Sequence, residues 1–299
     1  MVCSPLREKR DRKPRGAHPP FGSEVRIAGG GRGPTFAGHD SFGRLHAQLS
    51  NRDTHGGVHV QCPRQHRRPT AARRGEHSLH ARGAGGNRGK RPGRSRAALR
   101  SAAGAFELRY AAKVEVLRPP LPPTVKADNP GRLPLSILAH TLPSRYCESD
   151  RFSRIAWELF GKTEDRGEQI RAISQWISEK LTYAPGITDS RTSAWDVWIS
   201  RRGVCRDYTH LAIAFCRALS IPARYVGGYA AGLVPMDFHA CFEVYLGGAW
   251  RLFDPTDDIA PEHMAVISRG RDAASAALTT IFGKVTSAPI VVTCTAAQP

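Results

Sequence analysis

The chain divides near residue 100 into two stretches that differ sharply in apolar content. Only 13 of the first 100 residues are Ile, Leu, Val or Phe, and that stretch holds 22 Lys or Arg against 6 Asp or Glu. Ordering a backbone costs roughly 1–2 kcal/mol per residue, and so few apolar side chains cannot offset that cost. We therefore predict that residues 1–105 form a disordered, Arg/Gly-rich segment.

The formal net charge of +18 belongs almost entirely to this basic segment. Residues 101–299 hold 22 basic and 20 acidic residues, which leaves them a net charge of +2. The arginines of the segment could contact nucleic-acid phosphates, but only Phe21, Phe36 and Phe42 are available there to stack on bases. The composition therefore argues against a nucleic-acid partner and favours a solvated tail.

A third interpretation of the basic segment is that it is not a genuine reading frame. Arg, Gly, Pro, Ala and His occur there without periodicity, as they would if a GC-rich gene were read in a wrong frame or from a wrong start. The coding DNA upstream of Phe106 tests this hypothesis, because a true upstream frame should encode patterned strands.

The sequence contains neither the apolar run of a membrane-spanning helix nor the apolar stretch of a secretory signal. No run of 18 apolar residues occurs, and residues 1–15 are charged rather than apolar. We therefore expect a cytoplasmic protein without a membrane partner.

An ordered pattern begins at Phe106. Residues Phe106–Val116 alternate apolar and polar side chains, as a half-buried strand does. No partner strand can be read upstream, so we interpret residues 106–117 as the remnant strand of an N-terminal β-region. Residues 118–150, which begin with several prolines, are predicted to be a Pro-rich connector.

Residues 151–299 carry the periodicities of a globular domain. Helical patterns come first and strand patterns follow, which is typical of an α+β domain with an antiparallel sheet. Helices are predicted over Ser153–Phe160, over Glu164–Leu181, through Ile199 after a cap at Thr192 or Ser193, and over Cys205–Leu219. Strands are predicted over Ala223–Tyr229, Phe238–Leu246 and Ala249–Asp254.

Cys205 is the thiol best placed to react. The seven cysteines are widely spaced and include no C-x-x-C pair, so the sequence indicates neither a metal site nor a cofactor. Cys205 stands at the predicted start of a helix, where unpaired backbone N–H groups and the helix dipole favour a thiolate. Cys147 and Cys216 are interpreted as buried apolar residues. Asp207, in the first turn of the same helix, suits a structural role at the dipole at least as well as a catalytic one.

His239 and Asp254 are the residues best placed to act with Cys205. Four histidines follow residue 100, and His210 points roughly 140° away from Cys205 around the helix. His239 and Asp254 lie near the open ends of the predicted hairpin, eight and seven residues from its turn at Gly247. Antiparallel pairing brings such positions together, so Asp254 can orient one nitrogen of His239 and leave the other for Cys205.

Four blocks of the sequence resemble one known family. The blocks are Gly203–Leu211, Pro222–Tyr229, His239–Tyr245 and Trp250–Thr256. In this order they resemble the transglutaminase-like superfamily, and most closely its bacterial cysteine-peptidase-like branch.

The resemblance implies a papain-like or transglutaminase-like α+β core, in which a nucleophile helix packs on an antiparallel sheet. It also implies a catalytic triad of Cys205, His239 and Asp254. Such a site transfers an acyl group from a glutamine carboxamide or a peptide bond through a thioester, so the expected partner is a protein or peptide substrate. Transfer to an amine and transfer to water both stay open, as does the oligomeric state.

Two alternatives stand beside the enzyme. The domain could be a catalytically silent transglutaminase-like binding module, or the chain could act by binding nucleic acid through its basic segment. Tyr183 and Trp195 are candidate walls of the cleft, although burial in the core is the commoner role of such aromatic residues.

Overall fold

The computed structural model describes the backbone at residues 40–51, 56–61, 77–82, 96–101, 104–116, 118, 124, 130–277, 279–282, 285–287 and 290–296. Side chains are described at residues 114, 116, 118, 124, 131–277 and 290–296. None of the helices in these ranges has the length and apolar character that a bilayer-spanning segment needs.

The described residues before the connector include five strands. Strand β5 (Gly104–Glu115) pairs antiparallel with β1 (Asp40–Asn51) and with β3 (His77–Arg82). Strands β2 (Gly56–Gln61) and β4 (Arg96–Ser101) pair with each other. The strand predicted at residues 106–116 is therefore present, but the prediction that its partner strands are missing is wrong.

The disorder predicted for residues 1–105 stays a prediction: strands β1–β4 fall within that segment, and the rest of it lies outside the described residues. Composition reports how much apolar surface a segment can bury by itself. The strands are instead aligned by backbone hydrogen bonds to partners that are distant in sequence, which composition cannot reveal.

The C-terminal strands pair with this N-terminal β-region. Strands β13 (Val285–Ser287) and β14 (Val291–Ala296) both pair with β1, and β12 (Thr279–Phe282) pairs with β2. One sheet has the order β13-β1-β5-β3, with β14 also on β1, and another has the order β12-β2-β4. The last three strands of the domain predicted over residues 151–299 therefore belong to the sheets of the N-terminal β-region.

The helical half follows its sequence patterns closely. Asp165 accepts the backbone N–H of Glu168 at 2.9 Å and caps one helix, while Ser193 and Asp196 form a capping box at another. The helices are α1 (Leu135–Leu138), α2 (Ser153–Phe160), α3 (Arg166–Lys180), α4 (Ala194–Ser200) and α5 (Cys205–Ala218), and the 3-10 turns are η1 (Pro130–Arg132), η2 (Ser149–Phe152) and η3 (Pro261–His263).

Helix α5 forms the centre of the core. All side chains from Leu211 to Cys216 are fully buried, and Cys147 is buried too, which confirms the interpretation of these two thiols. The ring of Phe215 meets four aromatic rings edge to face at centroid distances from 5.2 to 5.9 Å, and this geometry stabilises aromatic pairs. The four rings belong to Phe152, Phe160, Trp176 and Trp198.

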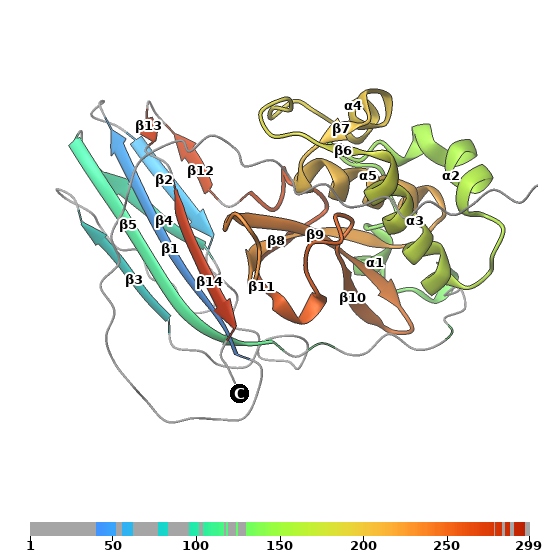
Figure 1. Ribbon diagram of the computed structural model, residues 1–299, viewed down its shortest axis with the longest axis horizontal. Helices are drawn as coiled ribbons and strands as arrows, with labels where there is room; N and C mark the ends of the chain where they lie inside the picture. Colours follow the sequence, from blue (N-terminus) through green and yellow to red (C-terminus); the bar gives the residue numbers. More distant parts are fainter. Residues whose placement is uncertain are drawn as a thin grey trace, which may run out of the picture. The chain divides into compact units, whose positions relative to one another are not determined.

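A four-stranded antiparallel sheet, here called the central sheet, packs against α5 (Figure 1). Its order is β10-β9-β8-β11, and the strands are β8 (Ala223–Ala230), β9 (Phe238–Leu246), β10 (Ala249–Phe253) and β11 (Met264–Gly270). Gly247 and Gly248 turn the β9–β10 hairpin with φ angles of +56° and +79°, which glycine adopts without strain. A two-residue parallel pair, β6 (Thr182–Tyr183) with β7 (Arg202–Gly203), lies just before α5 in sequence.

Glu243 on β9 is buried among three guanidinium groups. Its carboxylate lies 2.6 Å from Arg224 on β8 and 2.9 Å from Arg269 on β11, and Arg118 of the connector lies 3.9 Å away. Burial alone would raise the pKa of Glu243, but Arg269 and Arg224 outweigh it and lower this pKa to about 2. One carboxylate therefore joins three strands of the central sheet to the connector.

The replacement Glu243→Gln should lower the free energy of unfolding by about 3–5 kcal/mol, because it leaves buried arginines without their counter-charge. In the parent protein this stabilisation is complete above the ordinary glutamate pKa of 4.5 and is lost as the pH falls toward about 2. Urea unfolding at pH 7 measures the effect. The matched control is Glu158→Gln on α2, whose exposed pair with Arg154 contributes below about 1 kcal/mol. Equal destabilisation by the two replacements would contradict the prediction.

Candidate active site

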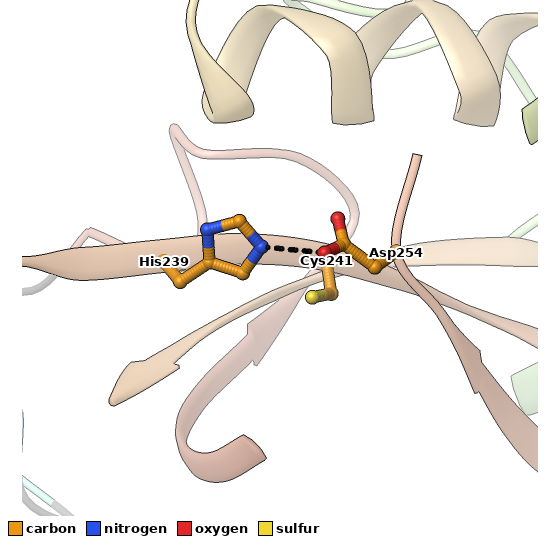
Figure 2. A group of neighbouring side chains, drawn as sticks. All are labelled: His239, Cys241 and Asp254. Atoms are coloured by element: carbon orange, nitrogen blue, oxygen red, sulfur yellow. Dashed lines mark hydrogen bonds and ion pairs between the residues drawn. The ribbon is translucent and has the colours of Figure 1, made fainter. Parts of the chain in front are cut away.

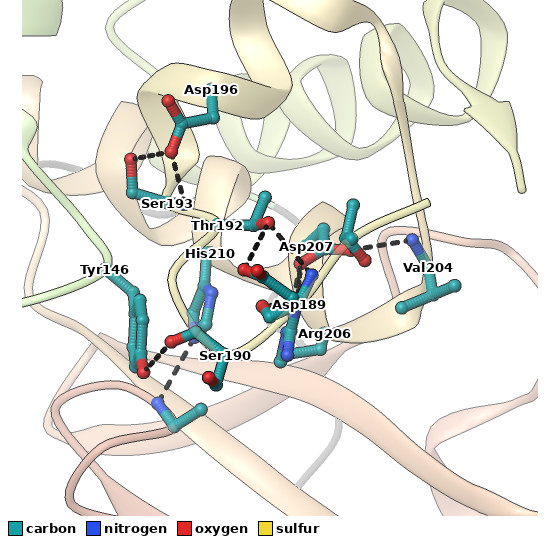
Figure 3. A network of polar contacts seen from close by, with 12 residues as sticks. Tyr146, Asp189, Ser190, Thr192, Ser193, Asp196, Val204, Arg206, Asp207 and His210 are labelled. Atoms are coloured by element: carbon teal, nitrogen blue, oxygen red, sulfur yellow. Dashed lines mark hydrogen bonds and ion pairs between the residues drawn. The ribbon is translucent and has the colours of Figure 1, made fainter. Parts of the chain in front are cut away.

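Cys205 is the first residue of α5, as the sequence predicts, and its side chain is partly exposed. The helix start is held by Asp207, whose fully buried carboxylate accepts the Val204 backbone N–H at 3.0 Å and the Thr188 hydroxyl at 2.7 Å. Arg206 pairs with the same carboxylate at 2.8 Å (Figure 3). Asp207 therefore positions the start of the helix and the preceding loop. This is the structural role that its place in the first turn of the helix suggests.

His239 is the second residue of β9, and Asp254 directly follows β10. The His239 Nε2 atom lies 3.0 Å from Asp254 Oδ2, so the contact predicted from the hairpin spacing is present (Figure 2). Asp254 Oδ1 also accepts the backbone N–H and the hydroxyl of Thr256, and Oδ2 accepts the backbone N–H groups of Asp258 and Ile259. These donors hold the carboxylate in place for the imidazole ring.

The His239 ring also makes hydrogen bonds to the thiols of Cys205 and Cys241. Burial alone would lower the pKa of His239, but the hydrogen bond to Asp254 and those to the two thiols raise it well above its usual range. Burial would raise the pKa of Asp254, yet its hydrogen bond to His239 and its Thr256 donors lower it. An imidazolium beside a carboxylate is thus the stable form of the pair.

The chemistry implied by this arrangement is that of a thiol next to a held imidazole. Because Nε2 of His239 engages Asp254, Nδ1 is the nitrogen left for the Cys205 thiol, and Figure 2 shows it on the side of the ring away from Asp254. The structure brings together the three residues that the sequence singled out, one from a helix and two from a hairpin.

Tyr183 lies at this site, whereas Trp195 does not. The Tyr183 hydroxyl meets the Cys205 backbone, and burial raises the pKa of Tyr183 to about 12, so the hydroxyl stays protonated. Trp195 instead packs in the core, 5.4 Å from the ring of Phe152 and under the guanidinium of Arg151. Of the two candidate cleft walls, only Tyr183 is close to the thiol.

Two other histidines, His140 and His210, pack against aromatic rings. His210 is fully buried, stacks 5.0 Å from Tyr146, and accepts the backbone N–H of Ala273 at 3.2 Å (Figure 3). Burial lowers its pKa to about 3, so it stays neutral. Burial likewise lowers the pKa of His140, which meets the ring of Trp250 edge to face.

Cys241 is the site residue that the sequence reasoning missed. Its thiol is fully buried, and its sulfur, a His239 ring nitrogen and an Asp254 oxygen lie within 4.8 Å of one another. The signal was available, because residues two apart on a strand point to the same face, and Cys241 follows His239 by two.

A cavity of about 600 Å³ lies between α3 and the edge strand β10, next to Asp254. Its lining includes Asp254 itself, Ser174 and Ser178 of α3, and Trp250 of β10. Asp254 thus pairs with His239 and also forms part of the wall of this cavity.

Comparison with known proteins places the chain in a family. The family model described as "Transglutaminase-like superfamily" matches residues 153–255, from the start of α2 to the residue after Asp254. A crystal structure named "a Putative Cysteine Protease from Cytophaga hutchinsonii" is 33% identical, with a TM-score of 0.78 over 87% of this chain and 91% of that one. The chain belongs to the transglutaminase-like superfamily. The predicted α+β fold, with a nucleophile helix on an antiparallel sheet, is thereby confirmed.

Curated relatives match a shorter part of the chain. An uncharacterized protein of Mycobacterium leprae is 33% identical over 139 residues, which is 44% of this chain and 50% of its own length. An uncharacterized protein of Mycobacterium bovis is 34% identical over 120 residues, or 35% of this chain and 38% of its own length. The chain thus spans half or less of the length of these curated relatives.

Proposed function

We propose that the chain is a cysteine-nucleophile enzyme that transfers an acyl group from a glutamine carboxamide or a peptide bond of a protein or peptide substrate. The observation that carries this proposal is the His239 ring, held by Asp254 at 3.0 Å through one nitrogen and hydrogen-bonded to the Cys205 thiol. A nucleophile, a base and a group that orients the base are the three parts that acyl transfer needs.

In the first step, the Cys205 thiolate attacks the substrate carbonyl carbon, and a tetrahedral intermediate forms with negative charge on the oxygen. The Cys205 backbone N–H at the start of α5 is the donor nearest to that oxygen. The Tyr183 hydroxyl oxygen accepts from this backbone, so the substrate oxygen would displace it from the N–H, and the hydroxyl proton could then donate to the same oxygen. One such donor contributes about 2.7–4 kcal/mol of transition-state stabilisation in other enzymes.

In the second step, the protonated His239 gives its Nδ1 proton to the departing ammonia or amine, and a thioester on Cys205 remains. An amine or a water molecule then attacks the thioester while His239 accepts its proton. The acceptor decides between transamidation and hydrolysis. Asp254 keeps its charge throughout and holds the ring in one orientation.

Thiol labelling tests this proposal directly. With iodoacetamide at pH 6, Cys205 should react first, because it is partly exposed and lies at a helix start beside His239, whereas Cys216 is fully buried and burial raises its pKa to about 12. The variant His239→Ala should slow the labelling of Cys205 at pH 6 by roughly tenfold or more. Peptide mass spectrometry reads out each site.

A matched control is the variant His263→Ala, which removes a partly exposed histidine from η3 and should leave the labelling rate unchanged. Slow labelling of Cys205, at the rate of Cys216 and insensitive to His239→Ala, would overturn the proposal and favour a silent binding module.

A further inference from the structure

One buried thiol, Cys241, lies beside two residues of the proposed triad and has no part in the acyl transfer described above. The Nε2 side of the His239 ring, the Cys241 sulfur and the Asp254 carboxylate lie close to one another beside strand β9, as Figure 2 shows. The three ligand atoms lie within 4.8 Å of one another, and the side chains of His239 and Asp254 are only 2% and 4% exposed. Cys241 is fully buried.

We propose that His239, Cys241 and Asp254 form a binding site for a thiophilic divalent cation of the zinc class, and that occupation of this site switches off the imidazole. A thiolate, an imidazole and a carboxylate together favour Zn²⁺, Co²⁺ or Cd²⁺ over Mg²⁺ and Ca²⁺, which bind oxygen ligands.

The distances suit such an ion with little movement. Zinc lies about 2.0–2.3 Å from nitrogen, oxygen and sulfur ligands, so tetrahedral ligand atoms are roughly 3.2–3.8 Å apart. His239 Nε2 and Asp254 Oδ2 already lie 3.0 Å apart, and the widest separation within the group is below 4.8 Å. The ion would take the place of the hydrogen bond between the imidazole and the carboxylate.

The charges of the ligands also suit a divalent ion. The Cys241 thiolate and the Asp254 carboxylate supply two negative charges, so the occupied site is neutral. A neutral group avoids the large cost of an uncompensated charge in a buried place. The backbone donors at Asp258 and Ile259 and those of Thr256 then orient the ligating carboxylate, as outer hydrogen bonds do in metal sites.

A route from solvent exists on the side away from Cys205. The cavity of about 600 Å³ between α3 and β10 has Asp254 in its wall, together with Asp257 and Glu262. Cys205 is not among the residues that line this cavity, so a cation in it would approach the group from the Asp254 side. A fourth ligand, a water molecule, can be supplied from the same cavity.

An ion bound to Nε2 of His239 would stop proton transfer at Nδ1. When the ion holds Nε2, a neutral imidazole carries its single proton on Nδ1, the nitrogen left for Cys205. His239 can then neither accept the Cys205 proton nor form the imidazolium. This loss of activity rests on the proposed function, but binding of the ion does not.

Cobalt absorption tests the site independently of any activity. The full chain with Cys3 and Cys62 replaced by serine would be titrated with Co²⁺, and a thiolate-to-cobalt charge-transfer band at one equivalent is expected. Cys241→Ala should abolish the band and weaken Co²⁺ binding at least roughly 100-fold, since removal of a mere supporting hydrogen bond already costs up to that much. Cys241→Ser, which keeps the volume, should also lose the band if the alanine variant does not fold.

The matched controls distinguish this site from a metal bound between Cys205 and Nδ1 of His239. Cys216→Ala, which removes another fully buried thiol, should keep the band, and so should Cys205→Ala. Loss of the band in Cys205→Ala with retention in Cys241→Ala would place the metal between Cys205 and Nδ1 and overturn the proposal. Absence of a band in the parent protein would overturn it too.

The regulatory part has its own readout. Zn²⁺ should slow iodoacetamide labelling of Cys205 in the parent protein, a chelator should restore it, and Cys241→Ala should be insensitive to Zn²⁺. If the band forms but labelling does not respond, the metal site stands and the switch is wrong. If labelling is slow with or without Zn²⁺ while the band forms, the proposed function fails and the metal site survives.

Discussion

Cys205→Ser should lower the release of ammonia from a glutaminyl peptide by at least about 10⁴-fold, the loss expected when an activated nucleophile is removed. A serine hydroxyl at the start of α5 keeps the shape of the side chain. It does not, however, form the anion that a thiol forms beside the protonated His239. A coupled ammonia assay measures the rate, and mass spectrometry of the acid-quenched protein detects the thioester.

The control for this replacement is Cys216→Ala on the same helix. Cys216 is fully buried and lies about three helical turns along α5 from Cys205. After correction for the folded fraction, we therefore expect activity within about twofold of the parent protein. Residual ammonia release above roughly 1% in Cys205→Ser would show that the thiol is not the nucleophile. If a peptide substrate is cleaved instead, the same comparison is read from the new amino terminus.

Asp254→Asn should lower the rate of acyl transfer by about 10²–10⁴-fold while Cys205 is intact, the range that loss of the orienting carboxylate produces in other triads. The asparagine amide places an N–H donor, or at best a neutral oxygen, where Oδ2 now accepts from His239 at 3.0 Å. The pKa of His239 then falls, because its strongest stabilising partner is lost. The imidazolium should accordingly disappear at a lower pH than in the parent protein.

A pH profile between 4 and 9 separates this effect from a loss of folding. The hydrogen bonds lower the pKa of Asp254, so in the parent protein the carboxylate stays charged at the acidic end of the profile. The control is Asp257→Asn, an exposed position at φ +58° that asparagine tolerates, and it should behave as the parent protein does. Equal rates and equal profiles for Asp254→Asn and the parent protein would refute the orienting role.

The order of helices and strands was readable from the sequence because it depends on local contacts. The predicted helices and strands from Ser153 to Asp254 all occur, with ends that move by only a few residues, since caps such as Ser193 and turns such as Gly247 act on their neighbours. The contact between His239 and Asp254 was readable for the same reason, because a tight hairpin sets its own register.

The partners of distant strands were not readable in this way. Strand β11 pairs with β8, and Ser41 of β1 pairs with Ala296 of β14, yet no turn or periodicity links these segments. The composition of residues 1–105 counts apolar side chains, and it cannot report the backbone hydrogen bonds through which β1 pairs with β5 and β14.

The sequence by itself determined the domain core, the family resemblance and the three residues of the proposed triad, since these follow from helix starts, hairpin spacing and adjacent motifs. Only the tertiary structure decided which side chains share the site. It placed Tyr183 at the thiol and Trp195 in the core, enclosed Asp207 in a structural role, and set Cys241 beside the imidazole. Such choices depend on how a helix, a sheet and the intervening loops pack, and packing is a property of contacts between residues that are far apart in the chain.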